Sequence, residues 1–217
     1  QMFVERYVVE NGEYRASMLD DDTTFGIQSS QKVGPTVADD IKTSAIWSIL
    51  FALIAIALYI LIRFRNISFS IGAVVGLVHD VLFILGIYSI FYSIMPFSLE
   101  IDQSFIAAIL TVIGYSINDT VVVFDRIREN VGLYPKRALN QLINMSVNST
   151  LSRTFSTSFS TALPLLAMFI FGGETIRGFV FAILLGVIVG TYSTIFIASP
   201  IAYDIQEKQA KKAIEKK

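Results

Sequence analysis

Five stretches of the 217-residue chain consist almost entirely of apolar residues. A run of about 18 such residues matches the ~30 Å hydrocarbon core of a bilayer, because a helix rises about 1.5 Å per residue. The alternating segments of about 10 residues that are typical of a membrane β-barrel do not occur. The pattern therefore predicts an all-α polytopic membrane protein with five transmembrane helices, over residues 45–62, 71–95, 105–124, 150–171 and 178–199.

The two ends of the chain are polar. Residues 2–9 and 14–19 are rich in residues that favour strands, and Gly12 provides a turn between them. Two short strands cannot bury a core of their own, so residues 1–44 are predicted to be the end of a larger periplasmic domain. Residues 201–217 form a basic cytoplasmic tail, and residues 134–144 are predicted to form a short helix in the loop before the fourth span.

The composition excludes several functions. Only 16% of the residues are charged, against about a quarter in soluble domains, and the formal net charge of −1 argues against a nucleic-acid partner. The chain has no cysteine and a single histidine, so no thiolate or multi-histidine metal site is expected. It also has no phosphate-binding loop and no nucleophile elbow. We therefore expect neither a cofactor nor an enzymatic activity.

Lysine and arginine are distributed unevenly among the predicted loops. Arg63 and Arg65 follow the first span, several basic residues separate the third span from the fourth, and lysines fill the tail. The intervening loops have few basic residues. The positive-inside rule therefore places the N-terminal segment in the periplasm and the C-terminus in the cytoplasm.

Asp119 is the sharpest functional candidate, because a charge inside a membrane span is costly and usually faces the helix bundle. It lies about five residues, or roughly 8 Å, inside the predicted end of the third span. Tyr115 and Asn118 lie with it on one polar stripe of this helix. Desolvation can hold such a carboxylate protonated until water or a cation arrives, as a proton relay requires. A structural hydrogen bond to a neighbouring helix is the alternative.

His79 and Asp80 lie within the second span, at a depth close to that predicted for Asp119. The two carboxylates are therefore expected to share one polar layer. Adjacent helix residues point about 100° apart, so His79 and Asp80 cannot both face Asp119 squarely. Structural bonding and direct proton handling fit Asp80 equally well, whereas a structural role is expected for His79.

Arg153 begins a face of the fourth span that also carries Thr157. Two roles fit Arg153: it can neutralise a deprotonated Asp119, or it can extend to lipid phosphate at the membrane surface.

Four glycines form two small-residue motifs that are typical of closely packed membrane helices. They indicate tight helix crossings at Gly72 and Gly76 and at Gly186 and Gly190.

Several of these motifs together resemble the bacterial SecF protein-export membrane family. The resemblance covers about residues 33–200, and the joined stretches 113–120 and 124–130 are its most specific part. It rests on Val-Gly-Pro at 33–35, residues 73–80 ending in His-Asp, Ile-Gly-Tyr-Ser-Ile-Asn-Asp-Thr at 113–120, Phe-Asp-Arg-Ile-Arg-Glu-Asn at 124–130, Ser-Arg-Thr at 152–154 and Phe-Gly-Gly at 171–173.

The resemblance implies a resistance–nodulation–division-type half of six helices in the bacterial inner membrane, of which this chain holds five. It implies a subunit that uses the proton motive force to promote export of unfolded preproteins. The implied partners are SecD, separate or fused, the SecYEG channel, accessory proteins of the YajC and YidC types, and membrane lipid. By the same resemblance Asp119 is the proton-path carboxylate and Arg153 its partner, and a first span and most of a periplasmic domain would precede Gln1 in a longer protein.

Two other functions fit the residues. One is half of a proton-coupled exporter of a small molecule or lipid, which would move that compound and leave preprotein export unaffected. The other is a structural scaffold of the translocation channel that moves no protons. A scaffold would tolerate Asp119→Asn and would be disturbed by bulky residues at Gly76 or Gly190.

Overall fold

The computed structural model describes residues 6–10, 13–17 and 35–215, with side chains described for residues 43–212. It divides into two compact units, residues 1–40 and 41–217. In the first, β1 (Arg6–Glu10) and β2 (Glu13–Ser17) pair antiparallel, with Tyr7 opposite Ala16. The predicted strand pair is present. The outer ends of the predicted strands, at residues 2–5 and 18–19, lie outside the described residues, as do residues 33 and 34 of the Val-Gly-Pro motif.

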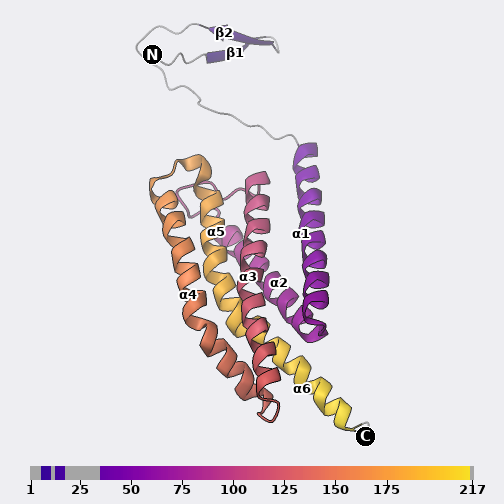
Figure 1. Cartoon of the computed structure of the whole chain (residues 1–217). Helices are drawn as coiled ribbons and strands as arrows, with labels where there is room; N and C mark the ends of the chain where they lie inside the picture. Colours follow the sequence, from indigo (N-terminus) through magenta and orange to yellow (C-terminus); the bar gives the residue numbers. More distant parts are fainter. Residues whose placement is uncertain (1–5, 11–12, 18–34, 216–217) are drawn as a thin grey trace. The chain divides into compact units, whose positions relative to one another are not determined.

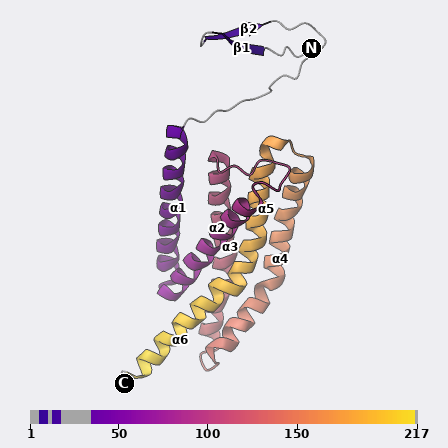
Figure 2. The same ribbon diagram turned by 180° about the vertical axis from the view of Figure 1, so that it is seen from behind.

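Five helices of the described residues are long and apolar enough to cross a membrane, which confirms the predicted fold class. They are connected by short turns and loops (Figures 1 and 2). The helices are α1 (Pro35–Phe64), α2 (Ile67–Phe91), α3 (Gln103–Leu133), α4 (Leu139–Phe171) and α5 (Glu174–Ser193), which runs on through the π-helix η1 (Thr194–Ala198) into α6 (Ser199–Glu215).

Side-chain caps move the start of two helices from the predicted positions. The side chain of Asn66 accepts a hydrogen bond from Ser68 N at 2.9 Å, so α2 begins four residues earlier than predicted. The same helix ends at Phe91 instead of residue 95. Asp102 caps α3 in the same way, through Phe105 N at 2.8 Å.

The third and fourth spans belong to helices that are longer than predicted. The helix predicted at residues 134–144 is wrong: residues 134–138 form the loop, and α4 begins at Leu139. The reason is that buried side chains continue beyond the apolar stretches. Ile127 on α3 and Leu142 and Ile143 on α4 are all buried, so the two helices stay paired up to the loop.

Helices α3 and α5 lie at the centre of the bundle, with α2 and α4 packed against them (Figures 1 and 2). A buried apolar core joins α2, α3 and α5 around residues such as Ile84, Ile109 and Val187. α1 lies at the edge, and very little of its span is buried. Large apolar side chains on the outer surface, such as Trp47 and Phe159, are suited to lipid contact.

The passage from α5 to α6 is a continuous helix with one widened turn. Pro200 has no N–H to donate to the carbonyl of Phe196, so the regular hydrogen-bond ladder cannot continue through it. The π-helix η1 ends two residues before this proline, and Ser199 Oγ donates to Thr194 O at 2.8 Å. The lysine-rich tail that follows is helical up to Glu215.

Candidate functional site

Asp119 is held inside the bundle on α3, with only 2% of its side chain exposed. Its Oδ1 lies 3.8 Å from Arg153 Nη1 on α4, a long ion pair, and Arg153 itself is 47% exposed. Among the described side chains, neither oxygen of Asp119 has a hydrogen-bond partner. A buried ionised carboxylate normally accepts several hydrogen bonds, so this site is incomplete for the charged form and open to a proton or to a further donor.

The polar residues near Asp119 in the sequence and near its partner Arg153 differ in their environments. The buried hydroxyls of Tyr115 and Thr154 have no hydrogen-bond partner among the described residues. Asn118 is exposed, and Thr157 donates to the carbonyl of Arg153 on its own helix at 2.9 Å. Thr154 was not among the sequence candidates, although it follows Arg153 directly.

Asp80 has the opposite environment. It is fully buried on α2, and its Oδ2 accepts hydrogen bonds from Ser116 Oγ at 2.7 Å and from Ser193 Oγ at 2.9 Å. His79 Nδ1 lies 3.3 Å from Oδ1. Ser116 lies one turn before Asp119 on α3, so the two carboxylates face successive turns of the same helix.

Sequence reasoning missed the hydroxyl residues that join the helices here. Ser116 and Ser193 hold Asp80, and Thr120 on α3 and Thr194 in η1 are 2.9 Å apart. A signal was available for the fifth span, where Thr191, Ser193 and Thr194 are close together in an otherwise apolar stretch.

The glycines predicted on the second span lie at a close helix crossing. A Cβ added to Gly72 would lie 2.6 Å from Ala198 O, and one added to Gly76 would lie 3.3 Å from Ala198 Cβ. The backbones of α2 and η1 therefore approach at a distance that larger side chains would prevent.

The glycines predicted on the fifth span lie against α3. A Cβ on Gly186 would overlap the side chain of Val112, and one on Gly190 would lie 3.0 Å from Ser116 Oγ. The absence of a side chain at Gly190 leaves room for Ser116, which donates to Asp80.

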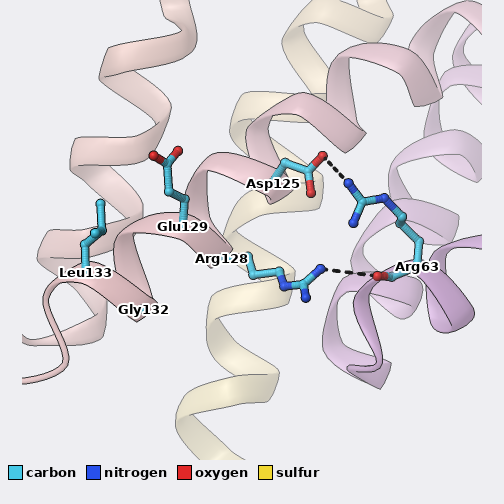
Figure 3. A pocket seen from close by; sticks show the side chains of 6 residues that line it. All are labelled: Arg63, Asp125, Arg128, Glu129, Gly132 and Leu133. Carbon is cyan, nitrogen blue, oxygen red and sulfur yellow. Dashed lines mark hydrogen bonds and ion pairs between the residues drawn. The ribbon is translucent and has the colours of Figure 1, made fainter.

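The Phe-Asp-Arg-Ile-Arg-Glu-Asn motif joins three helices at the end of the bundle where α1 meets α2. Asp125 forms an ion pair with Arg63 at 3.0 Å, and Arg128 donates to the carbonyl of Arg63 at 3.4 Å (Figure 3). Asn130, which is buried, donates to Ser146 on α4 at 2.7 Å. Asp125, Arg128 and Glu129 of the motif line an open pocket of about 400 Å³, and Arg63, Gly132 and Leu133 complete its lining.

The fold and the site together define a class: a multi-pass α-helical membrane protein with carboxylates buried between its spans. Among the described residues, no cluster of histidine and acidic side chains could hold a metal ion. The chain belongs to the family of protein export membrane proteins SecD/SecF, C-terminal, whose pattern it matches over residues 14–208.

Curated relatives in this family are protein translocase subunits SecF. The chain is 49% identical to that of Rhodothermus marinus over 207 residues, which are 95% of this chain and 66% of the relative. It is 45% identical to that of Rhodobacter capsulatus, covering 83% of this chain and 52% of the relative. For Thermodesulfovibrio yellowstonii the identity is 48%, over 81% of this chain and 56% of the relative.

The fold is also similar to a solved structure described as SecDF in a super-membrane-facing form. The TM-score is 0.74 at 37% sequence identity, and the match covers 85% of this chain and 24% of that chain. The five spans are thus those of a resistance–nodulation–division-type half. The chain spans between half and two thirds of the length of the three curated relatives named above.

Proposed function

We propose that this chain is the membrane part of an auxiliary subunit of the Sec protein translocase. With SecD and the SecYEG channel it uses the proton motive force to promote export of unfolded preproteins across the bacterial inner membrane. Accessory proteins of the YajC and YidC types are further partners in this proposal. Its role is to couple proton movement to motion, without catalysing a covalent reaction.

One observation carries this proposal: Asp119 is buried in a membrane helix, faces Arg153 at 3.8 Å and has no hydrogen-bond donor among the described residues. A carboxylate held only by a distant cation gains little from staying ionised, so proton binding competes well with the ion pair. Such a group can take up and release protons during a cycle.

The consequence of protonation follows from the charges. The ionised carboxylate attracts Arg153 and so draws α4 towards α3. A proton on Asp119 removes the negative charge and this attraction, which changes how the two helices pair. We propose that repeated switching between these states moves the N-terminal segment, which precedes α1 in the chain, against the emerging polypeptide.

The test uses the complete protein that contains this chain, together with SecD, in inverted inner-membrane vesicles. Translocation of a preprotein is measured with and without a proton motive force. Asp119→Asn is expected to abolish the stimulation by the proton motive force, because an amide side chain does not bind a proton near neutral pH. The matched control is Asp102→Asn, the same substitution at the exposed cap of the same helix, which is expected to retain full stimulation.

Full stimulation by Asp119→Asn would contradict the proposal and favour a structural scaffold. If Asp119→Asn instead abolishes the proton-coupled efflux of a compound and leaves preprotein export unchanged, the result would favour the exporter. Arg153→Lys keeps the charge, so it is expected to retain more stimulation than Arg153→Met.

We further propose that residues 1–44 are the end of a periplasmic domain and that the C-terminus is cytoplasmic. The support is the excess of basic residues in one alternating set of loops. Because the chain contains no cysteine, single cysteines are clean reporters of accessibility. A membrane-impermeant thiol reagent added to intact cells with a permeable outer membrane should label position 98 and leave position 136 unlabelled. The reverse pattern would contradict this orientation.

A further inference from the structure

Asp80 and the groups around it form a second polar centre that the proposed role of Asp119 does not use. Asp80 Oδ2 accepts from Ser116 and Ser193, and His79 lies beside Oδ1. The cluster joins α2, α3 and the last residue of α5. We propose that Asp80 is a second proton-binding site of the membrane part, in which the Ser193 hydroxyl changes its acceptor when the proton binds.

The hydrogen bonds of Ser193 carry this inference. Its Oγ is 2.9 Å from Asp80 Oδ2 and also 3.2 Å from the carbonyl oxygen of Gly190. A hydroxyl has one proton and can donate it to only one of the two acceptors at a time. The carboxylate and the carbonyl therefore compete for the same donor.

Each protonation state of Asp80 is satisfied by one choice of acceptor. When Asp80 is ionised, Ser193 and Ser116 both donate to Oδ2. When hydronium transfers a proton to Oδ2 and leaves as water, the new O–H group donates to Ser193 Oγ, and Ser193 turns its own proton to the Gly190 carbonyl. One O–H bond forms on Asp80, one negative charge disappears, and no polar atom of the cluster is left unpaired.

The charged surroundings of Asp80 are simple. His79, with 32% of its side chain exposed, is the titratable neighbour on α2. α3 presents the Ser116 hydroxyl, with Asp119 one turn further on. Among the described residues of α1, α5, η1 and α6, no charged group contacts Asp80. His79 is thus a partly exposed titratable group in direct contact with the buried carboxylate.

The site lies where it can influence the helix geometry. Ser193 is the last residue of α5, and the π-helix begins at Thr194, whose N–H donates to the Gly190 carbonyl. Protonation of Asp80 would give that carbonyl a second donor. Widened helical turns of this kind are frequent at functional sites.

Infrared difference spectroscopy of the complete protein in phosphatidylethanolamine–phosphatidylglycerol vesicles tests the proton site. Spectra at acid and alkaline pH should differ by the carbonyl-stretching band of a neutral carboxylic acid. Asp80→Asn should remove one such band, whereas Asp119→Asn should leave that band in place. An unchanged spectrum in folded Asp80→Asn would overturn the proposal, and so would a band that responds to sodium at constant pH.

A second variant tests the exchange of acceptors and does not depend on export. Ser193→Ala removes the acceptor of the Asp80 O–H group, so the acid band should move to higher frequency. Ser158→Ala is the matched control, because Ser158 is a buried hydroxyl paired with Thr191 and has no contact with Asp80. A band at the same frequency in Ser193→Ala and in the wild type would overturn the proposed role of Ser193. These spectra are independent of preprotein transport, so failure here and failure of the proposed function are separate results.

Discussion

Replacing Gly186 by alanine tests the close packing of α5 on α3. The added Cβ would overlap Val112 Cγ2 and would lie 2.5 Å from Cγ1 and 2.8 Å from Cβ of the same side chain. Relaxed carbon contacts are about 3.5–4.0 Å, so the helices must separate by roughly 1 Å. Val112 is fully buried and, being β-branched, cannot easily rotate away. We expect a loss of about 1–3 kcal/mol of stability.

Gly114→Ala is the matched control for this variant. Gly114 lies within α3, and a Cβ there would meet nothing within 4 Å. Alanine in a helix interior is favoured over glycine by up to about 1 kcal/mol, so this variant is expected to be as stable as the wild type or more stable. Reversible unfolding in mixed detergent–denaturant micelles, followed by circular dichroism, measures both changes.

The double variant Val112→Ala with Gly186→Ala isolates the contact itself. Each single change should be destabilising, the first by leaving a cavity and the second by overlap. Together they should cost less than the sum, with a coupling of about 1 kcal/mol or more, because the new methyl group occupies space that the valine has vacated. Equal stability of Gly186→Ala and Gly114→Ala, or an additive double variant, would refute the reasoning.

Three further predictions concern single contacts and use the same unfolding measurement. Asn130→Ala removes a buried hydrogen bond to Ser146 and should lower the stability by about 1–3 kcal/mol. Asp125→Ala removes an exposed ion pair and should lower it by less than ~1 kcal/mol. Equal losses of stability would contradict this ranking. Arg65 has φ of 52°, in the left-handed region, so Arg65→Gly should be stabilising by up to about 1 kcal/mol, and a clear loss would argue against strain there. Tyr88→Phe removes the hydrogen bond from a buried hydroxyl to the carbonyl of Gly178 and should lower the stability by about 1 kcal/mol. An unchanged midpoint of the unfolding transition would show that this bond contributes nothing to stability.

The number and approximate place of the membrane helices could be predicted because a bilayer imposes a length on every apolar span. The full extent of α3 and α4 could not. Around Asp125 and Asn130 the chain is polar on one face only, and a search for continuous apolar residues ends there. Ile127 lies between them and is buried, so the helix continues on an amphipathic pattern that hydropathy averages away.

The candidate site was predictable as a list of residues and unpredictable as a set of contacts. Asp80 and Asp119 were evident because charges within spans are rare. The partners of Asp80 were not, because hydroxyls in helices commonly bond to their own backbone. Thr157 does so, whereas Ser116 bonds to another helix and Ser193 reaches both another helix and its own backbone. Which hydroxyl can bond to a neighbouring helix depends on the rotation of each helix about its axis. The π-helix after Ser193 alters that rotation locally.

The two buried carboxylates differ in what this chain supplies to them. Asp80 has two hydroxyl donors and a neighbouring imidazole, and these groups satisfy it in either charge state. Asp119 has a single cation at 3.8 Å and no hydrogen-bond donor among the described residues. The described helices therefore offer Asp80 hydrogen-bond partners in both charge states, whereas they offer the ionised form of Asp119 only the charge of Arg153.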